Sequence, residues 1–169
     1  MAATDLLVDA FDRVREVVLG AIDGLTPDQL AWRMDGQTNS IGWLVWHLTR
    51  VQDDHVAAAA DIDQVWTARD YVSRFALPFD RLDTGYGHTP AEVAGVRGLS
   101  GDLLAEYHEA VRRQTIEYVR GLGDRDFDRI VDRSWNPPVT LAVRLVSVIS
   151  DDLQHAGQAA FVRGMLDRR

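Results

Sequence analysis

The chain of 169 residues contains no cysteine and no lysine. Without cysteine it has no disulfide framework, no thiolate zinc site and no cysteine nucleophile. Without lysine it offers neither a Schiff base nor a lysine general base for catalysis. Any metal site in this protein must therefore be built from nitrogen and oxygen ligands.

Long apolar runs and targeting segments are also missing. No stretch approaches the roughly 18 uninterrupted apolar residues of a membrane span, and the N-terminus lacks a basic segment followed by an apolar one. The formal net charge is −8, which disfavours generic binding to nucleic acid or to an anionic membrane. We therefore expect a cytoplasmic protein that acts on a small molecule, with no nucleic-acid or membrane partner.

Apolar residues spaced three or four apart predict four long helices in one domain that spans residues 1–169. Serine, threonine, asparagine or aspartate stands at the expected start of each helix, where its side chain can cap free backbone N–H groups. The predicted ranges are Thr4 or Asp5 to Asp23, Asn39 or Ser40 to about Ala60, Ser100 to Gly121, and Thr140 to about Arg163.

The segments between these helices predict the connections. Residues 61–87 lose helical periodicity, so we expect a long crossover with one or two short helical turns and no strands. Further short helical segments are expected after Thr26-Pro27 and from Thr89 to about Arg97. Residues 130–138 are expected to form a rigid loop. The fold prediction is an all-α four-helix bundle with a long crossover between its second and third long helices.

Two of the predicted helices carry chemistry-bearing side chains on their apolar faces. Asp151 and His155 are four residues apart, so they project from one face of the last long helix. His47 lies on the face that Leu44 and Leu48 mark as buried. Two imidazoles and a carboxylate are ligands of a divalent ion such as zinc, and three protein ligands leave positions open for water or substrate. Nickel, iron(II) and manganese remain open on this donor set.

The same residues have a simpler interpretation. An acid and a histidine four apart are common on helices, so His47 and His155 could be core histidines bonded to their neighbours. Asp151 would then be a solvated acid beside Asp152. Spacing by itself does not separate the two interpretations.

Two segments around these residues resemble signature segments of the DinB-like metal-binding superfamily. They are Ser40-Ile41-Gly42-Trp43-Leu44-Val45-Trp46-His47-Leu48 and Asp151-Asp152-Leu153-Gln154-His155-Ala156-Gly157-Gln158. The turn from Thr26 to Arg33 is similar as well, so the resemblance spans nearly the whole chain. It implies a four-helix bundle with a three-histidine divalent site.

Carried over by position, the resemblance implies metal ligands at His47, Asp151 and His155. Asp151 departs from the family, which usually has histidine there. Aspartate ligates the same ions, so the site would become more anionic. The departure leaves the native metal and its occupancy open.

The superfamily includes mycothiol-dependent maleylpyruvate isomerase and bacillithiol S-transferases. The resemblance therefore implies a transferase or isomerase that uses a divalent metal, zinc or nickel, and a low-molecular-weight thiol such as mycothiol. It also favours a homodimer. Two alternatives stay open: a metal-dependent hydrolase that uses the same site, and a non-enzymatic, stress-associated bundle that binds a metal or a small ligand.

Other polar residues are expected to have lesser roles. We expect His55 at the core boundary and His108 facing outward or sideways. His88 follows a glycine-hinged loop that could border a pocket, although a plain turn before Thr89-Pro90 is the favoured interpretation. Asp54 lies about 10 Å along the helix from His47, too far to share an ion. Asp152 and Gln158 are interpreted either as partners that orient the ligands or as polar residues at the surface or at the core boundary.

Overall fold

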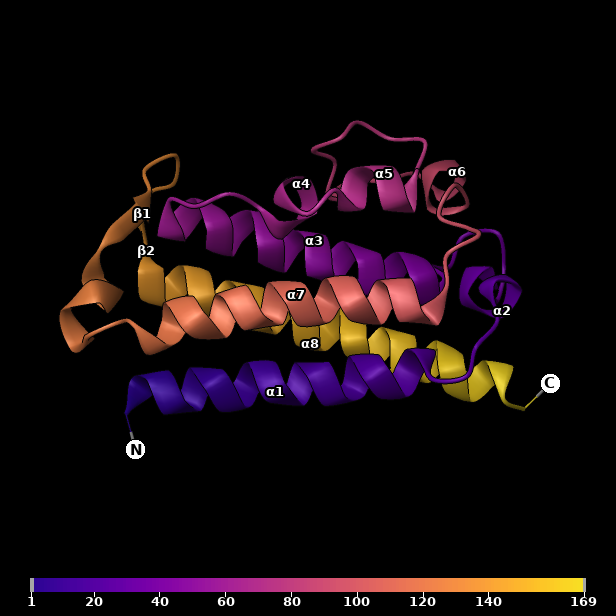
Figure 1. Ribbon diagram of the computed structural model, residues 1–169, viewed down its shortest axis with the longest axis horizontal. Coiled ribbons are helices and arrows are strands. Elements are labelled where there is room, and N and C mark those ends of the chain that lie inside the picture. Colours follow the sequence, from indigo (N-terminus) through magenta and orange to yellow (C-terminus); the bar gives the residue numbers. More distant parts are fainter. Residues whose placement is uncertain (1, 169) are drawn as a thin grey trace.

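Four long helices lie side by side in the computed structural model, which describes residues 2–168 (Figure 1). They are α1 (Ala3–Ile22), α3 (Ile41–Ala60), α7 (Gly101–Arg120) and α8 (Leu141–Leu166). The predicted all-α bundle is confirmed. None of the helices within residues 2–168 combines the length and the apolarity that crossing a membrane requires.

Side-chain caps fix where three of these helices begin. Ser40, Ser100 and Thr140 each accept a hydrogen bond from the backbone N–H three residues later. This bond satisfies one of the N–H groups that a helix start leaves free. The capping residues therefore set the register in which each helix presents its side chains to the core.

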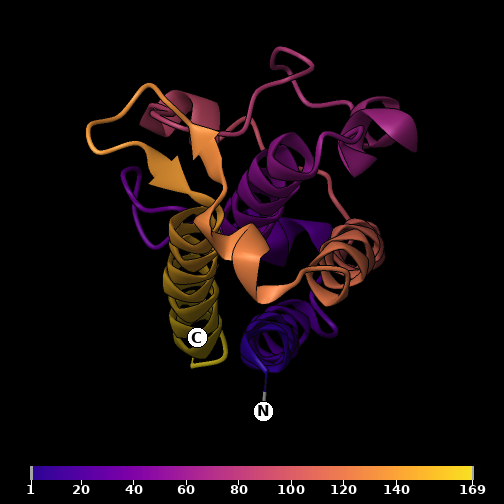
Figure 2. The same cartoon turned by 90° about the vertical axis from the view of Figure 1, so that its left-hand side faces the viewer.

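The four helices form a square in cross-section, with α3 diagonal to α1 and α7 diagonal to α8 (Figure 2). Helices α3 and α7 run in the same direction, so the chain between them must return along the bundle (Figure 1). This crossover lies over α3 and contains α4 (Val65–Ala68), α5 (Tyr71–Phe75) and α6 (Pro90–Val93). Residues 61–87 hold helical turns and no strand, as predicted.

A fully buried arginine fastens the crossover to α3. Arg50 donates hydrogen bonds to the carbonyl oxygens of Leu82 and Asp83, at 3.3 and 3.1 Å. Asp53, one turn further on, accepts bonds from the backbone N–H groups of Val65 and Trp66 at 2.9 and 2.8 Å. Both ends of the crossover segment that passes over α3 are thereby held by charge-assisted hydrogen bonds.

The prediction of a rigid loop at residues 130–138 is wrong. Strand β1 (Ile130–Asp132) pairs antiparallel with β2 (Val139–Thr140), and the two follow the 3-10 helix η1 (Asp124–Asp128). The strands are too short to show an alternating pattern, although their β-branched residues suit a sheet. The resulting hairpin covers the N-terminal end of α8 (Figure 2).

The core consists of two apolar clusters. On α8, Leu141, Leu145 and Val148 belong to one cluster, and Ala156 and Ala159 belong to the other. Between them lies a buried polar layer formed by Thr49, Asp53, His108 and Asp152 with their neighbours. This layer lies at the level of the bundle where the predicted metal ligands occur. The remaining short helix, α2 (Pro27–Ala31), packs its Leu30 against Gly42 at the start of α3.

Candidate metal centre

The structure brings His47, Asp151 and His155 together between α3 and α8. One ligand atom of each residue lies within 4.8 Å of the others, and the two imidazole centroids are 4.8 Å apart. Within residues 2–168, no other group of three or more histidine or acidic side chains has this geometry. Ligands on one ion with bonds of about 2.1 Å are at most about 4.2 Å apart, so small side-chain rotations would complete the site.

His47 is buried and tightly held. Its Nδ1 is 2.5 Å from the carbonyl oxygen of Thr84 in the crossover, and the indole of Trp43 stacks on its ring at 4.5 Å between centroids. A carbonyl can only accept, so Nδ1 carries the proton and Nε2 keeps a free lone pair. Burial lowers the pKa of His47, while the bond to Thr84 acts in the opposite direction. The neutral ring is the form that binds a metal.

His155 is arranged in the same way but is held less firmly. Its Nδ1 lies 3.2 Å from Oε1 of Gln158, one turn later in α8, and both side chains are partly solvated. The amide oxygen accepts, so the Nε2 lone pair is again free. That Nε2 atom is 3.6 Å from Oδ1 of Asp151, beyond hydrogen-bond distance. Gln158 therefore has the ligand-orienting position that the sequence left open.

The carboxylate of Asp151 completes the donor set. Its Oδ2 is buried and has no hydrogen-bond partner among residues 2–168. A buried anionic oxygen without a partner is costly, and a cation is the simplest group to compensate it. Two neutral imidazoles and this carboxylate fit a divalent ion, which the three residues would hold from one side.

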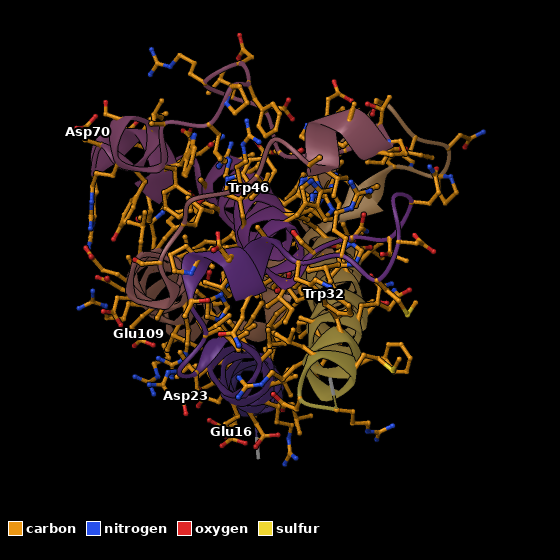
Figure 3. All side chains as sticks on the ribbon, turned by 90° about the vertical axis from the view of Figure 1, so that its right-hand side faces the viewer. Glu16, Asp23, Trp32, Trp46, Asp70 and Glu109 are labelled. Carbon is orange, nitrogen blue, oxygen red and sulfur yellow. The ribbon has the colours of Figure 1, made fainter. Side chains whose placement is uncertain are left out.

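The crossover forms the outer wall beside His47. Gly85 has a φ of +87°, and a Cβ built there would lie 2.9 Å from Nδ1 of His47 and from the Trp46 ring. Only glycine lets the backbone of residue 85 approach His47 this closely. Nearby, His88 accepts a hydrogen bond from Nε1 of Trp43 at 3.1 Å, and its Nε2 lies 3.0 Å from Asp83. Figure 3 shows Trp46 between α3 and the crossover.

A cavity of about 650 Å³ lies between α3 and α8, and two of the candidate ligands, His47 and Asp151, line its wall. Its mouth is lined by two exposed aromatic side chains, Tyr86 at 91 % and Trp135 at 67 % exposure. The hairpin supplies Val131 and Asp132 to its wall. The volume suits a small-molecule ligand, and it lies directly beside the candidate ion site.

Three sequence expectations near the site are wrong. His108 is buried and faces inward, with its Nδ1 3.2 Å from Oγ1 of Thr49. Asp152 is fully buried, and neither of its oxygens has a partner among residues 2–168, so it lies neither at the surface nor at the core boundary and is not hydrogen-bonded to the ligands. The favoured interpretation of His88 as a plain turn residue is wrong, because Trp43 and Asp83 bond to it beside His47, as the alternative of a loop at the border of a pocket allowed. For His108 and Asp152, which lie near the boundary between the buried and exposed faces of their helices, periodicity does not decide whether the side chain points inward or outward.

Some contributors were not predicted at all. Thr84 acts through its backbone carbonyl, which no side-chain pattern reveals. Arg144 lines the cavity and pairs with Asp132 at 2.8 Å. The one available signal was the segment Gly85-Tyr86-Gly87, whose paired glycines indicated an unusual backbone.

Known proteins resemble this chain over its whole length. The family model described as mycothiol-S-transferase matches residues 6–168. A solved structure, described as a conserved protein from Enterococcus faecalis, is 30% identical and superposes with a TM-score of 0.92. That similarity covers 100% of this chain and 99% of the other. No curated protein matches the chain. The family match covers the four-helix bundle and the segments that hold His47, Asp151 and His155, so the chain belongs to the mycothiol S-transferase family.

Proposed function

We propose that the protein binds a divalent metal through His47, Asp151 and His155 and transfers a low-molecular-weight thiol to a small electrophile. The observation that carries the proposal is the convergence of these three side chains beside a cavity that is large enough for a cosubstrate and is lined by His47 and Asp151. Membership of the mycothiol S-transferase family supports mycothiol as the thiol. A chain without cysteine must take its sulfur from another molecule.

Some residues of the chain would bind the metal, and others would position the cosubstrate. His47, fixed by the Thr84 carbonyl, and His155, oriented by Gln158, present neutral Nε2 atoms, and Asp151 adds a negative charge. A divalent ion bound there supplies Lewis acidity, which lowers the pKa of a thiol. The walls on α3 and α8 position the cosubstrate, and Trp43 and the crossover screen His47 from water.

Zinc or nickel is proposed as the metal. Zinc accepts two histidines and one carboxylate in catalytic sites and leaves a position open. Nickel also suits imidazole ligands. Asp151 in place of histidine gives a more anionic donor set, so the net charge of the occupied centre is lower by one than in a three-histidine site.

The test is an assay of metal-loaded protein with an electrophile such as 1-chloro-2,4-dinitrobenzene, with and without mycothiol. We expect turnover only with the thiol and none in His155→Ala. Equal product formation without thiol would indicate the hydrolytic alternative, in which the same site activates water. Stoichiometric metal with no turnover on a panel of thiols and electrophiles would instead support a binding protein.

We also propose a homodimer formed through α8. From Val143 to Phe161, the exposed face of this helix carries no charged side chain. Its exposed apolar members include Val146 at 61 % and Phe161 at 63 %. For two copies that each carry a charge of −8, an uncharged face is where repulsion is smallest.

Light scattering on protein eluted from a size-exclusion column measures the molar mass and tests whether this dimer forms. We expect a dimer for the parent and a monomer for Leu153→Glu, which places a charge in the centre of the face. The matched control is Leu6→Glu on α1, another exposed leucine, which should remain dimeric. A monomeric parent at micromolar concentration would contradict the proposal.

A further inference from the structure

The cavity beside the metal ligands contains a second polar group at its far end. Along α3 the cavity is lined by His47 and then by Asp54 and His55, and along α8 by Asp151 and then by Arg144. Asp54 and Arg144 are each seven residues from a metal ligand, which corresponds to about 10 Å along a helix axis. Val51 and Val148 line the wall between the two ends. A ligand held at the metal centre therefore reaches polar side chains again after roughly 10 Å.

Hydrogen bonds join the members of this second group. Arg144 donates from one terminal nitrogen to Oδ2 of Asp132 at 2.8 Å, and its other terminal nitrogen lies 3.2 Å from Nδ1 of His55. Asp54 accepts a bond from Gln64 at 2.8 Å through Oδ1. Its Oδ2 has no hydrogen-bond partner among residues 2–168, and it lies 3.7 Å from Nδ1 of His55. Free acceptor capacity therefore remains on Asp54.

The charges of this group are unbalanced. Asp132 offsets the positive charge of Arg144 through their ion pair. Burial and then the neighbouring guanidinium lower the pKa of His55, which favours its neutral form. The carboxylate of Asp54 is then left without an opposing charge in the cavity wall. A carboxylate on a ligand would meet Asp54 and an arginine that is already paired, whereas a hydroxyl can both donate to the acids and accept from the arginine.

We infer that Asp54, His55, Asp132 and Arg144 form a subsite for an uncharged, hydroxyl-rich arm of the thiol cosubstrate, and that this subsite selects against arms that carry a carboxylate. The inference rests on the proposed function, because it takes the metal centre as the place where the sulfur binds. The aromatic side chains of Tyr86 and Trp135 at the cavity mouth offer flat faces on which a sugar ring packs.

Two thiols that differ in one group test the selectivity. Each consists of N-acetylcysteine joined by an amide to a 2-amino sugar, and the sugar C6 carries a hydroxyl in one and a carboxylate in the other. Calorimetry on the zinc-loaded protein measures both dissociation constants. We expect the neutral thiol to bind about tenfold more tightly, the size of one unit-charge repulsion across roughly 6 Å at a dielectric constant of about 40.

Substitutions then assign the selectivity to named residues. Asp54→Asn removes the unopposed charge and keeps an acceptor for Gln64, so the selectivity ratio should fall to about threefold or less. Asp132→Asn frees the charge of Arg144 and should lower the ratio further. The control is Glu16→Gln, which removes one charge from the outer side of α1, away from the cavity (Figure 3). It should leave the ratio unchanged.

Analogues with alanine in place of cysteine separate this inference from the proposed function. If the metal does not bind the thiol, the alanine and cysteine compounds will bind equally, but the tenfold preference for the neutral arm and its loss in Asp54→Asn will remain. The subsite is overturned if the carboxylate arm binds as well as the neutral one. It is also overturned if both Asp variants leave the ratio unchanged, or if none of the compounds binds.

Discussion

Helix α3 packs against α7 on one side and α8 on the other, and the two interfaces treat buried polar groups differently. Towards α7, each buried polar side chain of α3 has a partner. The pairs are Thr49 with His108, Gln52 with Thr115 and Asp53 with Tyr107. The atoms left unpaired there, Nε2 of His108 and Oε1 of Gln52, belong to neutral groups. This interface is complete without a ligand.

Towards α8, His47 is bonded to the crossover, but the buried acidic groups are not paired. Oδ2 of Asp151 and both oxygens of Asp152 have no hydrogen-bond partner among residues 2–168. Burial raises the pKa of Asp152 well above its usual value, and the neighbouring Asp151 raises it further. A raised pKa favours the uncharged form of Asp152, so the unpaired acceptor of interest on this side is Oδ2 of Asp151, where we propose that a divalent ion binds.

The largest expected difference between the two sides is in metal affinity. His155→Ala removes a direct ligand and should weaken zinc binding on the order of a thousandfold, more than the 10- to 100-fold typical when an outer partner of a ligand is lost. His108→Gln, on the α7 side, should leave the affinity unchanged. Competition with a chromophoric zinc chelator measures both. Equal loss in the two variants would remove the distinction between the interfaces.

The α7 side should instead control stability against acid. Burial lowers the pKa of His108 to about 4, below its unfolded value of 6.5. The unfolded chain therefore takes up a proton first as the pH falls, and the folded state loses stability between about pH 6.5 and 4. From pH 7.5 to 4.5 the loss from this group is about 2 to 3 kcal/mol.

Urea denaturation of the chelator-treated parent and of His108→Gln, at pH 7.5 and at pH 4.5, measures the contribution of His108 to the free energy of unfolding. Other groups contribute similarly to both proteins, so their difference reports on His108. The parent should lose about 2 to 3 kcal/mol more than the variant. Parallel losses would show that His108 is solvated or already charged in the fold.

A smaller effect is expected from the wall behind His47. Gly85→Ala would place a Cβ 2.9 Å from Nδ1 of His47, so the ring or the crossover must move. Zinc affinity should fall about 10- to 100-fold, as for loss of an outer partner. Gly87→Ala is the matched control, since it also has a positive φ but no atom within 4 Å of the added Cβ. If both variants bind zinc as the parent does, the wall does not position His47.

The smallest effect is expected where a ligand is held loosely. Gln158→Leu removes the acceptor for Nδ1 of His155, but the contact is long and exposed, so we expect a loss of zinc affinity of only about three- to tenfold. Gln154→Leu is the control, because Gln154 bonds to Ser150 and not to a ligand. A loss above about 100-fold would mean that the α8 side is as strictly organised as the α3 side.

Much of the fold was predictable because helix periodicity and capping residues indicate where the long helices lie and where they begin. Ser40, Ser100 and Thr140 were expected at helix starts and cap them in the structure. The β-hairpin was missed because two or three residues per strand give no period. The closeness of His47 to Asp151 and His155 followed from placing each on an apolar face.

The rest of the site depends on contacts between segments that are distant in sequence. The Thr84 carbonyl reaches His47 only because Arg50 and Asp53 hold the crossover against α3. The inward orientation of His108 depends on which face of α7 packs against the core. Successive residues of a helix point about 100° apart, so a rotation of that size would turn His108 outward. Sequence patterns carry no information on either contact.

The most direct test of the candidate metal centre is a crystal structure of the zinc-loaded protein with anomalous diffraction at the zinc edge. We predict a single strong peak between α3 and α8, about 2.0 to 2.2 Å from Nε2 of His47, Nε2 of His155 and an oxygen of Asp151. A peak elsewhere, or none at full zinc saturation, would contradict the account.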